Sequence, residues 1–263
     1  MIKKLVIGLS AAALIATVHA ASTASDNASN PPYGGSHGWN AGDNGGTGFG
    51  AWSTVTQGFI GSSTSNGTSP SGGIDTGGVS FGLFSNTGAQ GTAEASRPFT
   101  GNMTVGQTFN LAFDNGFVGN GGTVGFGLMS GTTPRFEYFF VGGNNNYTVS
   151  GSTGQTTTHG FTADGMQTAF TLTGTDTFKF TISFNSGTPT TETFTGTLKG
   201  TAGTAITGFR LFDSDPNQAP AGSDAFYNSP TLVNAVPEPS MLSLLAGPTL
   251  LAGYFFLRRR RAS

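Results

Sequence analysis

Few side chains in this sequence could carry out catalysis, and its glutamates are the first candidates. Glu94, Glu137 and Glu192 are the only glutamates ahead of the C-terminal end of the chain. Hydrolysis of a glycosidic bond requires two carboxylates about 5 to 10 Å apart, and no closely spaced acidic pair lies on an expected strand. Glu137 sits among aromatic residues, but an outward-facing strand residue paired with Arg135 is the favoured interpretation. The sequence therefore predicts no enzyme.

One aspartate-rich segment could bind calcium. Asp213, Asp215 and Asn217 are spaced like the oxygen ligands of a calcium-binding loop, and Asp224 follows at the twelfth position. Such a loop has glycine at its sixth position and glutamate at its twelfth, whereas this chain has Gln218 and Asp224 there. A turn rich in aspartate is the favoured interpretation. Calcium is the one cofactor left open, and otherwise none is expected.

Histidine and tryptophan offer little more. Only His37 and His159 follow residues 1–20, too few for a histidine metal cluster or a Ser-His-Asp triad. Trp39 and Trp52 could stack on sugar rings at a sheet face, although two tryptophans in a large β domain more often belong to the core. Core packing is favoured, and sugar stacking stays open.

The composition excludes several classes of site. The chain has no cysteine, so it has neither disulfides nor thiolate metal sites. Six of its eleven basic residues lie at the two ends, which leaves residues 21–237 with five basic residues against twelve acidic ones and a net charge of −7. A basic surface for nucleic acid is therefore not expected.

The elements that would hold these side chains are β-strands. The 43 glycines and 23 phenylalanines are typical of short strands, tight turns and an aromatic core. Apolar residues alternate with small or polar ones, without a helical period between the sets. The expected strands include 79–83, 105–113, 124–128, 136–141, 147–149, 170–173, 178–184, 193–199, 206–212 and 226–233. We expect an all-β fold, a two-sheet antiparallel sandwich of the jelly-roll type over residues 39–234, with about ten to twelve strands. A parallel β-helix is the alternative, and the lack of a fixed repeat counts against it.

Glycine and asparagine runs mark the expected turns. They occupy residues 114–116, 119–122 and 142–146, where these residue types adopt positive φ at low energy. Residues 21–38 contain Asn-Pro-Pro and Gly-Gly and are expected to form a flexible lead into the sandwich.

Residues 1–20 have the order of a secretion signal. Lys3 and Lys4 precede an uncharged apolar run, residues 5–18, and small residues follow it. As a helix that run is about 21 Å long, short of the ~30 Å needed to cross a bilayer. We expect a signal helix that is cleaved by signal peptidase after Ala20, or one residue later after Ala21, once the chain has passed the Sec translocon. A buried core helix is the alternative.

The C-terminal end reverses that order of charge. Residues 241–257 carry no charge and lead directly into Arg258, Arg259, Arg260 and Arg261. The run is just long enough for a transmembrane helix, and the arginines would hold residues 258–263 in the cytoplasm. Pro248 would weaken the helix in its middle, which suits a transient span better than a permanent one.

A short motif stands directly ahead of this apolar run. The linker, residues 235–240, contains Pro237, Glu238 and Pro239. The motif, the apolar helix and the terminal arginines together resemble the PEP-CTERM sorting signal of exopolysaccharide-producing Gram-negative bacteria. The resemblance covers residues 236–263 and implies that an exosortase-like membrane protease recognises the motif and processes the chain near it. An ordinary tail anchor behind a proline-rich linker is the alternative.

The body carries a looser likeness, in residues spread over its length. They are Trp39, Trp52, residues 136–143, residues 209–212, Phe226 and Tyr227. With them the body resembles the concanavalin-A-like jelly-roll domains of exported bacterial proteins, a fold that often binds glycans and sometimes cleaves them. We expect a non-enzymatic protein of the cell surface or extracellular matrix that passes through the inner membrane and associates with exopolysaccharide in a biofilm. A lectin-like carbohydrate-binding module and a glycosidase or polysaccharide lyase are the alternatives.

Overall fold

The computed structural model describes residues 22–33, 37–56, 59–63, 73–85, 91–185, 188–215 and 223–235. They all belong to one compact unit, Ser22–Ala235, and their regular structure consists of fifteen β-strands. The strands are β1 Ser22–Ser25, β2 Ser53–Thr56, β3 Phe59–Ser63, β4 Ser80–Phe84, β5 Gly91–Pro98, β6 Thr108–Val118, β7 Thr123–Ser130, β8 Thr133–Val141, β9 Asn146–Ser150, β10 Gly154–Gly160, β11 Met166–Leu172, β12 Thr177–Phe184, β13 Thr190–Thr197, β14 Gly208–Asp215 and β15 Ser223–Val233.

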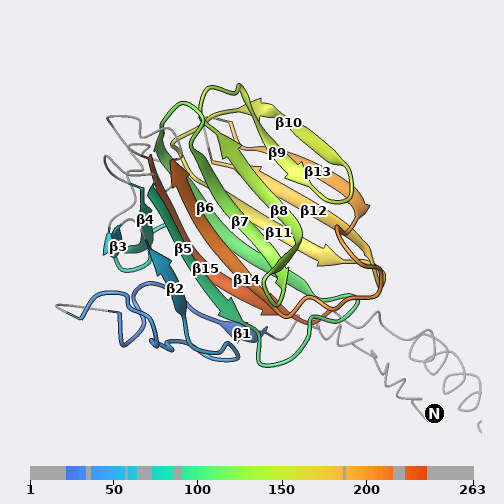
Figure 1. Ribbon diagram of the computed structural model, residues 1–263, viewed down its shortest axis with the longest axis horizontal. Helices are drawn as coiled ribbons and strands as arrows, with labels where there is room; N and C mark the ends of the chain where they lie inside the picture. The colour runs from blue at the N-terminus through green and yellow to red at the C-terminus, as the bar shows by residue number, and fades with distance from the viewer. Residues whose placement is uncertain are drawn as a thin grey trace, which may run out of the picture. The chain divides into compact units, whose positions relative to one another are not determined.

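The strands form two sheets that face each other (Figure 1). The eight-stranded sheet has the order β13-β12-β11-β6-β15-β4-β3, and β1 pairs with β15 beside that path. The seven-stranded sheet has the order β10-β9-β8-β7-β14-β5-β2. Every strand pairing among the described residues is antiparallel. The expected two-sheet antiparallel sandwich is confirmed, with more strands than expected, and the parallel β-helix alternative is wrong.

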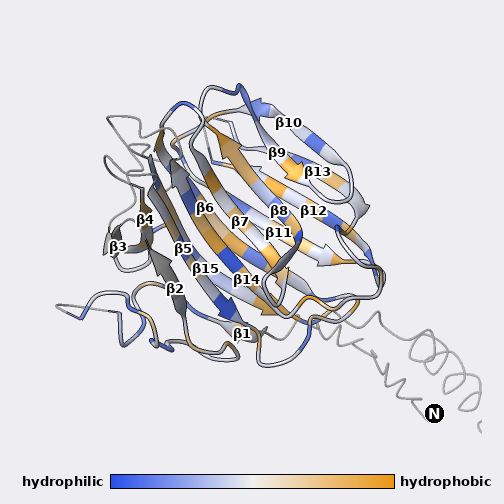
Figure 2. Ribbon diagram, in the orientation of Figure 1, coloured by the Kyte–Doolittle hydropathy of each residue, from blue (hydrophilic) through white to orange (hydrophobic). Residues whose placement is uncertain are grey.

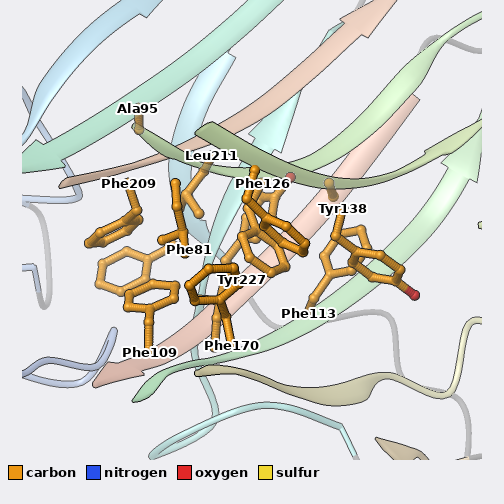
Figure 3. Close-up of a cluster of buried hydrophobic side chains, with 14 of the residues drawn as sticks. Phe81, Ala95, Phe109, Phe113, Phe126, Tyr138, Phe170, Phe209, Leu211 and Tyr227 are labelled. Carbon is orange, nitrogen blue, oxygen red and sulfur yellow. The ribbon is translucent and has the colours of Figure 1, made fainter. Parts of the chain in front are cut away.

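Aromatic side chains fill the space between the two sheets. On β12, Phe178, Phe180, Ile182 and Phe184 are buried while the residues that alternate with them are more exposed, because successive side chains of a strand point to opposite faces. Figure 2 shows the same alternation as bands of high and low hydropathy along the strands. Each buried phenylalanine contributes on the order of 2 to 3 kcal/mol. Figure 3 shows rings from both sheets meeting in this core, among them Phe109, Phe113, Phe126, Tyr138, Phe170, Phe209 and Tyr227.

The segment expected to be a flexible lead belongs to the sandwich instead. β1 pairs with β15, and Ser22 lies opposite Val233. Tyr33 is completely buried, and its hydroxyl makes hydrogen bonds inside the domain. The expectation for residues 21–38 is therefore wrong over residues 22–33, because strand pairing and the buried tyrosine fix a segment whose composition resembles a linker.

Two local expectations inside the domain also fail. Residues 114–116 lie within β6 rather than at a turn, because the strand pairs with β15 through Asp114 and Asn115. Val105 precedes β6 and is 56% exposed, so it does not point into the core. The turns at residues 119–122 and 142–145 are confirmed, since they connect β6 to β7 and β8 to β9.

Several predictions lie outside the described residues. They concern the signal at residues 1–20 with its cleavage at Ala20 or Ala21, the motif Pro237-Glu238-Pro239, the apolar run 241–257 and the arginine tail 258–263. Within the part of the chain that the structure describes, no helix has the length and apolar character needed to span a membrane.

Candidate functional site

Four charged side chains cross the outer face of the seven-stranded sheet, where β5, β14, β7 and β8 lie side by side (Figure 1). Arg210 on β14 donates from Nη1 to Oε1 of Glu94 at 3.0 Å, and from Nη2 to Oε1 of Glu137 at 2.9 Å. Lys199 donates from Nζ to Oε2 of Glu137 at 2.5 Å. We call these four residues the charged row. Its two cations and two carboxylates give it no net charge.

The register of the sheet explains how the row forms. Glu137 on β8 is opposite Gly127 on β7, and Gly127 is opposite Arg210 on β14. Neighbouring strands lie about 4.8 Å apart, so the long arginine side chain must cross β7 to reach the glutamate. A β-carbon on Gly127 would lie 3.1 Å from Cγ of Glu137. The glycine therefore leaves the space that the ion pair uses.

Arg135 does not pair with Glu137, contrary to expectation. A bulge in the pairing of β7 with β8 breaks the alternation at this point, and Arg135 is buried. Its guanidinium donates to the backbone oxygen of Lys199, and to Oδ1 of Asp176 at 2.5 Å. The contact fixes the backbone at Lys199 and so helps to place its ammonium group beside Glu137.

A cleft of about 420 Å³ opens against the charged row, within the size range of sites for small ligands. Glu94 and Arg210 belong to both the row and the lining of the cleft. The rest of the lining consists of Ser53, Ser96, Arg97, Pro98, Met129, Gly131, Thr132, Thr207, Gly208 and Phe209. The hydroxyls of Ser96 and Thr132 offer donors and acceptors to an uncharged ligand, whereas the hydroxyls of Ser53 and Thr207 already donate to backbone oxygens of the chain.

Neither glutamate of the row stands free to act alone. Arg210 holds the carboxylates of Glu94 and Glu137, and Lys199 holds the latter from the other side. A general acid must present a proton to the ligand, whereas these carboxylates accept hydrogen bonds from cations. The arrangement is better suited to orienting a ligand than to transferring a proton to it.

The tryptophans lie in the core. Trp39 and Trp52 are each 2% exposed, their rings meet edge to face with centroids 5.0 Å apart, and both contact Phe81. The core interpretation is confirmed. Sugar stacking by Trp39 and Trp52 at a sheet face is wrong, because other side chains cover both rings.

The aspartate-rich segment begins as a strand, so the expected turn is wrong at Asp213 and Asp215. Asp213 is completely buried within β14, and the Ser85 hydroxyl donates to its Oδ1 at 2.6 Å. Asp215 is the last residue of β14, and Asn217 lies outside the described residues. Among the described residues, no three His, Cys, Asp or Glu side chains are grouped closely enough to hold a metal on their own.

Arg210 and Lys199 complete the charged row, yet neither stands out in the sequence as a site residue. Arg210 lies between Phe209 and Leu211, and this alternation indicates an outward position on a strand. It does not reveal the partner, since Glu94 is 116 positions away and the order of strands in a sheet is not a local property.

The sequence matches no protein-family model and no curated protein. Its structure is similar to a glycosyl hydrolase family 16 protein from Mycobacterium smegmatis, with 11% identity, 58% of this chain and 74% of that chain covered, and a TM-score of 0.42. It is similar to alginate lyase A1-II′ of polysaccharide lyase family 7, with 14% identity, coverage of 64% and 85%, and a TM-score of 0.42. It is also similar to the carbohydrate esterase vb_24B_21 of Shiga toxin-encoding bacteriophage phi24B, with 12% identity, coverage of 82% and 100%, and a TM-score of 0.45.

Proposed function

We propose that the body is a non-catalytic domain that binds a neutral saccharide in the cleft beside the charged row. One observation carries the proposal: a cleft lined by apolar side chains and a few hydroxyls lies against a row of charges that sums to zero. A sugar presents hydroxyls to such a lining and apolar C–H groups to side chains such as Met129 and Pro98. An anionic polymer is disfavoured, because residues 21–237 carry a net charge of −7.

Glycoside hydrolysis is the second candidate. It is favoured by the placement of Glu94 and Glu137 on either side of one guanidinium, since glycosidases use a pair of carboxylates. The ion pairs count against it, because they occupy both carboxylates with cations. We therefore favour binding without cleavage.

Titration of the purified full-length chain with neutral oligosaccharides tests the binding proposal. Ser96 faces outward from β5 into the cleft, so Ser96→Phe fills the site without entering the core. We expect this variant to bind at least about tenfold more weakly, as is usual when a group blocks a small pocket. Thr148→Phe on β9 is the matched control, because it adds the same bulk to the same sheet face away from the cleft lining.

The result decides between the two candidates. Wild-type chain that binds none of the oligosaccharides, or a Ser96→Phe variant that binds as well as Thr148→Phe, contradicts the cleft as the site. Release of reducing ends that stops in both Glu94→Gln and Glu137→Gln would establish hydrolysis instead of binding alone.

We further propose that the chain is exported and sorted. The support is the sequence of its ends, residues 1–20 and 236–263. The chain passes the Sec translocon, is cleaved by signal peptidase after Ala20 and is held in the inner membrane. An exosortase-like protease then processes it near Pro237, and it reaches the cell surface or matrix of a Gram-negative bacterium, where exopolysaccharide is its partner.

Intact-mass measurement of protein from the cell surface and from the medium tests this sequence of export and processing steps. Protein that retains Arg258 to Arg261 contradicts it.

A further inference from the structure

Asp114 is a buried carboxylate without a hydrogen-bond partner. It lies on β6 and is 1% exposed, and neither Oδ1 nor Oδ2 accepts a hydrogen bond. Moving an ionised carboxylate out of water without a partner is strongly unfavourable. The group therefore requires either a proton or a cation at its oxygens.

The surroundings of Asp114 explain why water is excluded. The residue faces outward from the eight-stranded sheet, two positions after Ala112 on the same face of β6. Ala112 packs with Ile74 and Phe226 in a second apolar cluster, separate from the main core. Phe226 is also the residue opposite Asp114 on β15. Apolar side chains thus cover this part of the outer face.

A second carboxylate reaches the same place. Gly116 follows Asp114 on the outer face of β6, and a β-carbon on Gly116 would lie 2.1 Å from Oδ1 of Asp224. Same-face positions of a strand are about 7 Å apart, so the carboxylate above Gly116 is a neighbour of Asp114. Oδ1 of Asp224 also has no hydrogen-bond partner. A bulge between Ser223 and Ala225 in the pairing with β6 places Asp224 there.

The charges around this pair are negative. The pKa of Asp114 is raised to about 7, mainly by burial and in addition by the carboxylates of Asp224, Asp164 and Asp75. The backbone N–H of Gly165 opposes this shift, although it is not in hydrogen-bonding geometry with either oxygen. Burial also raises the pKa of Asp224. No arginine or lysine of the described residues forms an ion pair with Asp114 or Asp224.

We propose that Asp114 and Asp224 bind a calcium ion on the outer face of the eight-stranded sheet. Their ligand atoms are all carboxylate oxygens, which hard cations prefer. Calcium accepts six to eight oxygens in irregular geometry, so backbone oxygens and water can complete a shell that these two side chains begin. Magnesium demands a nearly regular octahedron, which a bulged strand pairing fits poorly. The site is on the other sheet from the cleft, so it is independent of saccharide binding.

Thermal unfolding of the purified full-length chain in chelator and in millimolar calcium tests the proposal. Calcium at a hundredfold excess over Kd is expected to raise the Tm of the wild-type chain by about 5 °C or more. Asp114→Asn removes a ligand and a buried charge together, so it is expected to fold and to lose the response. Asp224→Asn is expected to weaken calcium binding at least about tenfold, measured by calorimetric titration. Glu94→Gln removes an equal charge from the other sheet and is expected to keep the full response.

Three outcomes would overturn the calcium site. An identical Tm for the wild-type chain in chelator and calcium means that a proton, not a cation, neutralises Asp114. A response that persists in both Asp114→Asn and Asp224→Asn places any bound calcium elsewhere. An equal response to magnesium overturns the choice of calcium as the ion.

Discussion

Two buried clusters of ionisable side chains differ in how completely their hydrogen bonds are satisfied. One surrounds Arg97 and Asp26, whose side chains are both completely buried. The other contains Asp114 and Asp224, on the outer face of the eight-stranded sheet. The first cluster joins opposite charges, whereas the second brings like charges together.

In the Arg97 cluster, every nitrogen of the guanidinium donates a hydrogen bond to another group of the chain. Nε donates to the backbone oxygen of Gly50 at 2.6 Å, and Nη2 donates to Asn44 Oδ1 and to the backbone oxygen of Gly45, each at 2.7 Å. Nη1 donates to Oδ2 of Asp26. The guanidinium also lies over two aromatic rings, those of Phe49 and Trp52, at 5.0 and 5.2 Å from their centroids. Such a cluster requires nothing from outside the chain.

The contrast separates a structural cluster from a candidate binding site. A buried charge with every partner supplied by the chain holds segments together, and here it ties Asp26, Gly45 and Gly50 to Arg97 on β5. A buried charge whose oxygens have no partner indicates a missing proton or ion. Burial alone does not distinguish the two, but the count of satisfied atoms does.

The largest expected effect comes from removing Arg97. Arg97→Ala leaves the Asp26 carboxylate buried without its cation, and losing one partner of a buried ion pair destabilises a protein by about 3 to 5 kcal/mol. Denaturant unfolding measures the change. Arg210→Ala is the matched control, because that arginine is partly exposed and its loss is expected to cost much less. Equal losses in the two variants would remove the distinction between the clusters.

The next effect has the opposite sign. Asp114→Asn is expected to stabilise the chain at pH 8 in chelator by on the order of 4 kcal/mol, since 1 pKa unit corresponds to about 1.4 kcal/mol. The pKa of Asp114 is raised from 3.8 in the unfolded chain to about 7 in the folded one. The folded state therefore binds more protons between these values, and its stability falls as the pH rises from about 4 to about 7. Urea midpoints across that range measure the fall, which Asp114→Asn should reduce, while the raised pKa of Asp224 leaves a smaller fall in the variant. A parallel fall in the variant contradicts the assignment.

How much of this could be foreseen from the sequence differs between the sheets and the sites. The strands expected at 178–184 and 206–212 could be predicted, because apolar residues alternate with polar ones and specify one buried face, as Phe178 and Phe180 do on β12 and Phe209 and Leu211 on β14. The strand through Asp114 could not be predicted, because Asp-Asn-Gly is a strong local turn signal and only the pairing with β15 overrides it. The charged row could not be predicted either, since it joins Glu94 to Arg210, which is 116 positions away in the sequence. Local residue preferences predict where strands form, whereas the order of strands in a sheet decides which side chains come together in a site.

A smaller effect tests whether hydrogen bonding or packing holds the Arg97 cluster. The Tyr33 hydroxyl donates to Oδ2 of Asp26 at 2.6 Å and accepts from Gly45 N at 2.9 Å and from Trp52 Nε1 at 3.0 Å. Tyr33→Phe keeps the ring and removes these bonds, so a loss of about 1 to 2 kcal/mol is expected. Trp52 fluorescence during unfolding reports on the same contact. A variant as stable as the wild-type chain would mean that aromatic packing alone fixes the segment.

The smallest effect is expected at an ion pair whose two side chains are partly exposed and have hydrogen-bond partners. Lys199 and Glu137 meet at 2.5 Å, but their side chains are 26% and 16% exposed, so water screens the pair. Lys199→Ala is expected to change the free energy of unfolding by less than about 1 kcal/mol, because solvent replaces the lost ammonium group. Denaturant unfolding in low and high salt measures it, and Lys179→Ala, which removes an exposed lysine from β12, is the control. A loss for Lys199→Ala as large as that for Arg97→Ala would show that pairing itself, rather than complete burial, makes a charge cluster structural in this protein.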